Sequence, residues 1–338
     1  MNLKFIAGPM ATVSHQGFRM TVEAFGGCDE YFTEMINASS FINGGPWEKF
    51  YVLNDCAPQK IVWQLTGNDG TSIAKAASLL CKKEGIGIDI NMGCSAPQIY
   101  KTGAGISWMI KPLKETEDAV KKTCDALLEH EALTGEKKRL SVKCRLGDDS
   151  FSDEGFFSFI EMLYKNGVKL ITLHPRTKKE KERFAPRFSY AERIKKLFPQ
   201  MQVYINGCIK NKETALNALK QCPSADGIMI SREAAKRPWI FAELKEQLKA
   251  EENGTEYIKS FSVDREKVLL DYIDYVIKYQ PKEFVKTRLQ RFFSLYCPQF
   301  SFGHWFTMRL INSKSVEQCE EKIKEYFLHN PSDRIVMY

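Results

Sequence analysis

The chain has 338 residues, of which 43% are hydrophobic and 27% charged, a composition typical of a folded globular protein. No apolar run is long enough to span a membrane and the segment up to Pro9 is too short for a signal peptide, so we expect a cytoplasmic protein with no membrane partner. The formal net charge is +7, and the ten cysteines are scattered without any Cys-x-x-Cys spacing, so we expect reduced thiols and no metal site.

Short apolar runs with strand character recur through the first 230 residues. Helical patterns separate several of them, as at 70–83 and 113–130. This alternation predicts a parallel sheet buried on both faces, and eight such units fit a (β/α)8 TIM barrel. A doubly wound open sheet is the alternative, but no Gly-x-Gly-x-x-Gly follows the first run. The eight runs cover residues 4–7, 31–35, 60–65, 87–90, 140–144, 170–173, 202–205 and 227–230.

The strand pattern stops near residue 240, and helical patterns follow a linker at 250–260. Pro281 suits the first turn of a helix, and Ser315 with Gln318 has the spacing of a capping box. We therefore predict an α/β fold: a TIM barrel over 1–245 with a small C-terminal all-α helical-bundle domain over 246–338. The helices are expected at 264–279, 281–296, 305–312 and 315–329.

Polar side chains follow nearly every predicted strand, where barrel enzymes carry their chemistry. Any one of them could be a local cap or a solvated turn, but their recurrence at matching positions predicts a functional site. The ends are occupied by Pro9-Met10, Glu34, Gln64, Asn91 with Cys94, Lys143 with Arg145, His174 with Arg176, Asn206-Gly207 and Ser231-Arg232.

These strand-end groups differ in the chemistry they can do. The residues after the seventh and eighth runs, including Arg232, suit a phosphate group. Gln64 and Asn91 present paired donors and acceptors that suit the edge of a planar heterocycle. Cys94 is both a good acid and a nucleophile, although a buried structural thiol remains the alternative.

Two stretches are locally basic. Residues 176–196 hold nine basic and three acidic residues, and residues 278–314 hold seven basic residues and one acid. Phe292, Tyr296 and Trp305 are interleaved with the second stretch. Basic and aromatic residues together fit an RNA partner, and two solvated faces with inward aromatics are the alternative.

A series of motifs runs through the predicted barrel in order. They are Gly8-Pro9-Met10-Ala11, Thr33-Glu34-Met35-Ile36, Gln64-Leu65-Thr66-Gly67, the run 87–94 with Gly103-Ala104-Gly105, Lys143-Cys144-Arg145, His174-Pro175-Arg176-Thr177, Asn206-Gly207 and Met229–Arg232. In these motifs the chain resembles the tRNA-dihydrouridine synthases, flavin-dependent barrel enzymes with a C-terminal helical domain. It departs from the usual family pattern at Gly8, Ser95, Pro175, Cys208 and Ser231.

The resemblance implies FMN as the cofactor, bound across the barrel, with NADPH as the electron donor. Hydride from the reduced flavin would go to C6 of a uracil, and Cys94 would protonate C5 as general acid. The cofactor-binding residues that it implies are Pro9, Met10, Ala11, Gln64, Lys143, His174, Asn206, Gly207, Cys208, Ser231 and Arg232.

The resemblance also implies tRNA as substrate and partner, with the target base taken out of its stack. Asn91 and Arg176 would hold the base, and we expect a monomer. The full set of substrate-binding residues is Asn91, Arg145, Arg176, Arg187, Lys286, Arg288 and Arg291. An FMN barrel oxidoreductase acting on a free pyrimidine and a non-catalytic RNA-binding protein are the alternatives.

Overall fold

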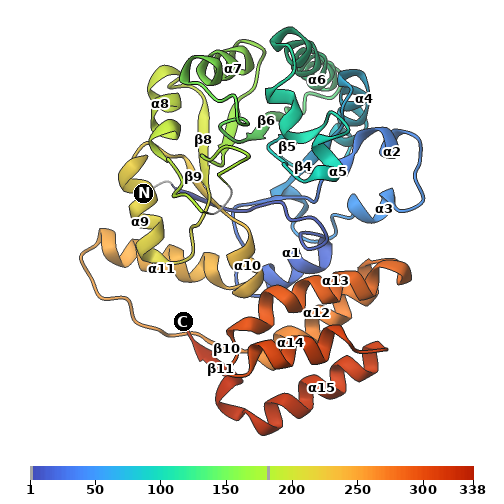
Figure 1. Ribbon diagram of the computed structural model, residues 1–338, viewed down its shortest axis with the longest axis vertical. Coiled ribbons are helices and arrows are strands. Elements are labelled where there is room, and N and C mark those ends of the chain that lie inside the picture. The colour runs from blue at the N-terminus through green and yellow to red at the C-terminus, as the bar shows by residue number, and fades with distance from the viewer. Residues whose placement is uncertain (1–2, 181–182) are drawn as a thin grey trace. The chain divides into compact units, whose positions relative to one another are not determined.

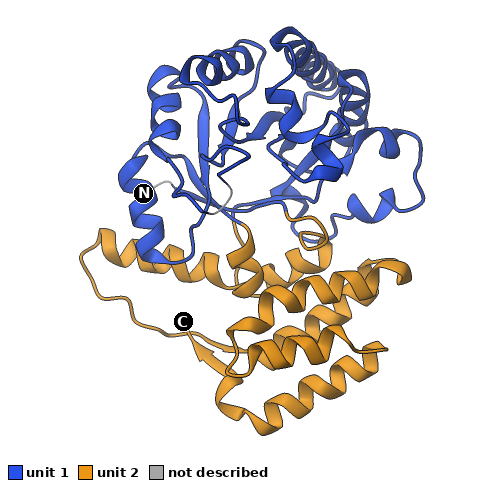
Figure 2. Ribbon diagram, viewed as in Figure 1, with its two compact units in different colours: residues 1–9, 29–230 blue, residues 10–28, 231–338 orange. Residues whose placement is uncertain are grey.

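The structure is a computed structural model that describes residues 3–180 and 183–338 (Figure 1). Lys181 and Glu182, which belong to the basic stretch at 176–196, lie outside the described residues. The chain forms two compact units (Figure 2): unit 1 comprises 1–9 and 29–230, and unit 2 comprises 10–28 and 231–338. The division into functional domains at 245/246 stays a prediction.

Unit 1 is a closed barrel of parallel strands. β1 pairs with β2 on one side and with β9 on the other, and β2 also pairs with β4, which closes the circle. β2 and the short β3 both pair with β4 and act as one interrupted strand, so eight strand positions result. The predicted TIM barrel is confirmed. Its strands are β1 (Lys4–Ala7), β2 (Glu30–Phe32), β3 (Ile36–Asn37), β4 (Ile61–Thr66), β5 (Gly87–Met92), β6 (Arg139–Cys144), β7 (Leu170–Leu173), β8 (Gln202–Asn206) and β9 (Gly227–Ile230).

The helices of unit 1 surround the strands (Figure 1). Several begin at a side chain that accepts backbone N–H groups of the first turn: Asp69 before α4, Ser152 before α7 and Asn211 before α9. The helices expected at 70–83 and 113–130 are confirmed as α4 and α6. The set is α2 (Ala38–Ile42), α3 (Glu48–Tyr51), α4 (Gly70–Cys81), α5 (Pro97–Tyr100), α6 (Leu113–Thr134), α7 (Asp153–Lys165), α8 (Ser189–Leu197) and α9 (Lys212–Gln221).

A buried charge cluster lies at the amino end of the barrel, the end where the strands begin. Glu30 accepts both terminal nitrogens of Arg139 at 2.9 and 2.6 Å, Nζ of Lys4 at 2.9 Å and the Tyr204 hydroxyl at 2.7 Å. Burial alone would raise the pKa of Glu30, but the bonds from Arg139 and Lys4 outweigh it and the pKa is lowered. The apolar side chains of Ile6, Phe32, Val62, Leu170 and Met229 pack with Tyr204 into one core cluster.

Unit 2 is mainly helical. The four predicted C-terminal helices are confirmed, and α1 belongs to this unit because it packs on α12. The structure adds a two-stranded antiparallel ribbon of β10 and β11, which the sequence analysis did not predict because strands of three residues show no clear periodicity. The elements are α1 (Gln16–Glu23), α10 (Arg232–Lys236), α11 (Ile240–Glu252), β10 (Ser262–Asp264), α12 (Arg265–Tyr279), α13 (Lys282–Tyr296), α14 (Gly303–Ile311), α15 (Val316–His329) and β11 (Ile335–Met337).

Candidate active site

The loop that carries Cys94 is fixed from both sides. Asn91, near the end of β5, accepts the backbone N–H groups of Gly93 at 3.2 Å and Cys94 at 2.9 Å through Oδ1. The Cys94 carbonyl accepts the N–H of Ile106 at 3.0 Å. At Gly105, which has φ of +59°, an added Cβ would lie 2.5 Å from that carbonyl oxygen, so only glycine fits. The half-buried thiol of Cys94 is free, while its backbone is held in place.

A network of amides extends from this loop into the barrel. The Asn91 amide nitrogen donates to Oε1 of Gln64 at 2.9 Å, and Nε2 of Gln64 donates to Asp89 at 2.8 Å. Asp89 also accepts the Ser141 hydroxyl at 2.7 Å. We call Asp89, Gln64 and Asn91 the amide network. Because Asp89 can only accept when ionised, it fixes which end of the Gln64 amide faces Asn91.

Asp89 has no neutralising ion-pair partner within hydrogen-bond distance among the described residues. Burial raises its pKa to about 6, although the bonds from Gln64 and Ser141 and the charges of Lys143 and Arg139 oppose the rise. Sequence analysis missed this residue. The available signal was an acidic residue between Ile88 and Ile90 in the otherwise apolar run 87–90.

Lys143 stands on β6 directly opposite Asn91 in the strand register. Its Nζ donates to Oδ1 of Asn206 at 3.0 Å, and the Asn206 amide donates in turn to the Met229 carbonyl at 2.8 Å. Burial, followed by repulsion from Arg145, lowers the pKa of Lys143 to about 8. A lysine with such a pKa keeps its charge at neutral pH and loses it in mildly alkaline solution.

His174 and Arg176 form a second polar group at the same end of the barrel. Nη1 of Arg176 lies 3.2 Å from Nε2 of His174, and a guanidinium can only donate, so this nitrogen of the imidazole is unprotonated. Arg176 also donates to the Phe184 carbonyl at 2.6 Å and to the Cys208 sulfur at 3.1 Å. Gly207, with φ of +130°, leaves room for His174, which would lie 3.0 Å from an added Cβ.

Other predicted substrate residues contact the protein itself. Arg145 donates to the Gly93 carbonyl at 3.0 Å and so supports the Cys94 loop. Arg187 forms an ion pair with Glu180 at 2.8 Å. In unit 2, Arg288 is buried and donates to Gln280 at 3.1 Å, whereas Lys286 and Arg291 are exposed on α13.

The predicted cofactor residues are divided between the units. Pro9 ends the first segment of unit 1, which also holds Gln64, Lys143, His174, Asn206, Gly207 and Cys208. Met10, Ala11, Ser231 and Arg232 belong to unit 2. The Met10 N–H donates to the Ser14 hydroxyl at 2.8 Å, while Ala11 and Arg232 are exposed.

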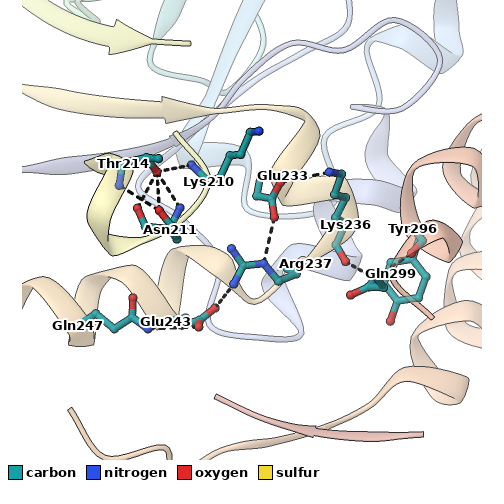
Figure 3. A network of polar contacts seen from close by, with 10 residues as sticks. All are labelled: Lys210, Asn211, Thr214, Glu233, Lys236, Arg237, Glu243, Gln247, Tyr296 and Gln299. Atoms are coloured by element: carbon teal, nitrogen blue, oxygen red, sulfur yellow. Dashed lines mark hydrogen bonds and ion pairs between the residues drawn. The ribbon is translucent and has the colours of Figure 1, made fainter. Parts of the chain in front are cut away.

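Polar contacts also order the segments that follow the two candidate phosphate loops (Figure 3). In unit 1, Asn211 and Thr214 form a capping box at the start of α9. In unit 2, Arg237 pairs with Glu233 at 3.2 Å and with Glu243 at 2.8 Å. These contacts hold the backbone after β8 and after β9 in defined conformations.

A family model described as "Dihydrouridine synthase (Dus)" matches residues 5–324 of the chain. The chain belongs to the dihydrouridine synthase family. Membership makes it an oxidoreductase and implies a flavin as its cofactor, in agreement with the resemblance seen in its motifs. No helix in the described part of the chain is long and apolar enough to cross a membrane, and no group of potential metal ligands gathers among those residues.

Individual relatives of this family cover different shares of the chain. It is 31% identical over 253 residues to the "Probable tRNA-dihydrouridine synthase" of Aquifex aeolicus, covering 73% of this chain and 75% of that protein. The "Probable tRNA-dihydrouridine synthase 2" of Bacillus subtilis is 26% identical over 95% of this chain and 93% of its own. The chain spans 36% of the length of the Rattus norvegicus "tRNA-dihydrouridine(47) synthase [NAD(P)(+)]-like", at 28% identity.

Proposed function

We propose that this dihydrouridine synthase reduces the C5=C6 bond of a uridine in tRNA, with FMN as its flavin and NADPH as the electron donor. The observation that carries the proposal is the Cys94 loop, which holds a free thiol at a barrel strand end through the amide network. The matching of the family model to nearly the whole chain and the names of the relatives support the same reaction.

The donor set at the carboxyl end of the barrel, where the strands end, fits a flavin. Gln64 on β4 supplies a carboxamide, Lys143 on β6 an ammonium and His174, directly after β7, an imidazole; together they suit the polar edge of a planar heterocycle. Gly207 and Cys208, both with positive φ, supply a turn after β8 suited to approach by a phosphate. When bound, FMN supplies a carrier for the hydride that comes from NADPH and goes to C6 of uracil.

The protein's own chemical contribution is the proton. As a hydride adds to C6, the π electrons of the C5=C6 bond take a proton at C5 from the Cys94 thiol, which becomes a thiolate. Lys143 interacts electrostatically with Cys94 and keeps its positive charge at neutral pH. The lysine therefore stabilises the thiolate as it forms, and a proton from solvent restores the thiol.

Binding of tRNA would also use positive charge on unit 2. Lys286 and Arg291 are exposed on α13 and suit contacts with phosphates. Arg288 is buried, so its removal would disturb packing as well as charge. A double Lys286→Ala/Arg291→Ala variant is therefore the informative change, and it should weaken tRNA binding while the flavin content stays unchanged.

The Cys94→Ala variant tests the assignment. We expect NADPH to reduce its flavin at the wild-type rate, while dihydrouridine formation in tRNA falls by at least about 100-fold, the size of a lost general acid. Cys124→Ala is the matched control, because Cys124 is a partly buried free thiol on α6. Dihydrouridine formation by Cys94→Ala at the wild-type rate would refute the acid role. Equal turnover of free uridine and tRNA would favour an oxidoreductase acting on small molecules.

A further inference from the structure

A small pocket in unit 1 lies beside the loop of Cys94. Its volume is about 180 Å³, and its walls come from the end of β3, the turn after β4 and the loop between Gln98 and Ala104. That last loop is the continuation of the Cys94 segment, which closes on itself through the bond from Ile106 N–H to the Cys94 carbonyl. None of the predicted cofactor-binding residues and none of the residues of the amide network line this pocket.

The lining of the pocket is mostly apolar surface with several polar side chains, none of them charged. Its polar side chains are hydroxyls and carboxamides, including Asn37, Ser39, Ser72, Gln98 and Thr102, and no ionisable side chain lines it among the described residues. Such a lining suits a ligand that both donates and accepts hydrogen bonds and is itself uncharged.

A phosphate is disfavoured by the helix next to the pocket. Ser72 lies in the first turn of α4, where exposed backbone N–H groups would attract an anion. However, the carboxylate of Asp69 already accepts the N–H groups of Thr71 at 3.3 Å and Ser72 at 2.7 Å. An anion here would meet a negative charge in place of open donors.

Thr66 gives the second, independent indication of a ligand. It lines the pocket, is 3% exposed, and its hydroxyl has no hydrogen-bond partner in the described residues. Leaving a buried hydroxyl unpaired costs about 1–3 kcal/mol, so a ligand that pairs with it would gain binding energy. An uncharged ligand with a hydroxyl or amide group would supply the missing partner.

We propose that this pocket binds the uncharged sugar or base of a nucleoside next to the reacting uracil. The volume equals that of about six water molecules in the liquid, so it takes one ring and not a whole nucleotide. This inference rests on the proposed function, since both substrates of that reaction carry nucleosides. The nucleoside comes either from the tRNA, as a neighbour of the target uridine, or from NADPH, and the chemistry recognised is the same.

Thr66→Val tests the proposal, because it keeps the shape of the side chain and removes only the hydroxyl. Thr172→Val is the matched control: Thr172 is buried on β7, its hydroxyl also has no partner in the described residues, and it does not line the pocket. Both variants should fold at least as stably as the wild type. We expect Thr66→Val to raise KM for unmodified tRNA about 5-fold, the effect of one hydrogen bond, with kcat nearly unchanged. Thr172→Val should leave both constants at the wild-type values.

A second variant, Ser39→Leu, fills the pocket from its exposed rim and should raise the same KM by more than Thr66→Val does. A rise in KM for NADPH instead of tRNA would support the pocket and assign it to the reductant. Wild-type KM values for both substrates in Thr66→Val and Ser39→Leu would overturn the inference. If the wild-type protein itself failed to reduce uridine in tRNA, the proposed function would fail first, so the two failures are distinguishable.

Discussion

The two ends of the barrel bury charge in opposite ways. At the amino end, Glu30 is surrounded by Arg139, Lys4 and a tyrosine hydroxyl, and its pKa is lowered. Further toward the carboxyl end, Asp89 in the middle of β5 is bonded only by an amide and a hydroxyl and its pKa rises to about 6, while the pKa of Lys143 near the end of β6 falls to about 8. The amino end stabilises ionised groups, and the carboxyl end holds groups whose charge changes near neutral pH, as proton transfer requires.

The largest expected effect comes from breaking the cluster at the amino end. Arg139→Met would leave Glu30, which is 1% exposed, without its main counter-ion. Removing one partner of a buried ion pair costs about 3–5 kcal/mol, so we expect the free energy of unfolding in urea to fall by that amount. The rate of uridine reduction per folded molecule should stay at the wild-type value.

Lys4→Met is the control for this cluster. Lys4 bonds the same carboxylate, but its side chain is 43% exposed, so its removal should cost less than about 1 kcal/mol. An equal fall in the free energy of unfolding for Arg139→Met and Lys4→Met would show that the buried Arg139–Glu30 pair contributes no more to stability than the exposed bond from Lys4.

The next effect is a difference in the pH dependence of stability. Asp89 has a raised pKa, so between about pH 4 and 6 the folded protein keeps a proton that the unfolded chain has released. Stability therefore falls as the pH rises through this window, and the loss remains above it. Asp89→Asn should remove this loss and stabilise the protein at pH 8 by about 2–3 kcal/mol, with no gain near pH 4.

Glu30 should show the opposite sign. Because its pKa is lowered in the folded protein, its contribution is present above the unfolded pKa and is lost as the pH falls below about 4.5. Urea unfolding of the wild type, Asp89→Asn and Glu30→Gln from about pH 3 to 8 separates the two. If the stability of Asp89→Asn equals that of the wild type at every pH, the predicted opposite pH dependence of Asp89 and Glu30 is wrong.

The amide network should matter more for turnover than for folding. Asp89→Leu would leave the Gln64 amide without its acceptor, so that it no longer orients Asn91 and the Cys94 loop. We expect uridine reduction to fall about 10- to 100-fold, as for misplacement of a catalytic group. Reduction of the flavin by NADPH should change little.

Asp89→Asn should restore most of this activity. The new amide can present its oxygen to Gln64, while Ser141 turns its hydroxyl to the Ile88 carbonyl, now 3.3 Å away. A protonated Asp89 likewise keeps a carbonyl oxygen that can accept from Gln64, so the rates of the wild type and of Asp89→Asn should depend on pH in the same way between about pH 5 and 8. An equal loss of activity in both variants would mean that the charge of Asp89, and not its acceptor, is what the site needs.

Much of the barrel followed from sequence because strands buried on both faces are continuous apolar runs. The starting and ending residues of β1, β7 and β9 agree with the predicted runs, and Cys94 was found because it follows such a run. What sequence could not give is which polar groups face each other across strands. Asp89 contacts Gln64 and Ser141 only because β4, β5 and β6 are neighbours in register, and no local pattern in the sequence encodes that adjacency.

The linker and the C-terminal helices were also predictable, since caps and Pro281 mark their ends. The assignment of residues 10–28 to unit 2 was not, because it depends on packing of α1 on α12, which is far away in sequence. For the same reason, Arg288 was predicted to bind substrate together with Lys286 and Arg291, although it is buried and donates a hydrogen bond to Gln280.

The smallest expected effect tests whether the carboxyl end also carries backbone strain. Cys208 has φ of +54°, a left-handed conformation that asparagine tolerates better than cysteine, and its sulfur accepts a bond from Arg176. Cys208→Asn should relieve the backbone strain and offer Arg176 a stronger oxygen acceptor, so we expect the free energy of unfolding in urea to rise by about 0.5–1 kcal/mol.

Ala57→Asn is the control, because Ala57 has φ of +49° and precedes β4 at the amino end. It should gain only a few tenths of a kcal/mol from the backbone. An equal rise in the free energy of unfolding for both variants would mean that the bond from Arg176 adds nothing. A fall for Cys208→Asn would mean that packing of the thiol stabilises the protein by more than the backbone strain destabilises it.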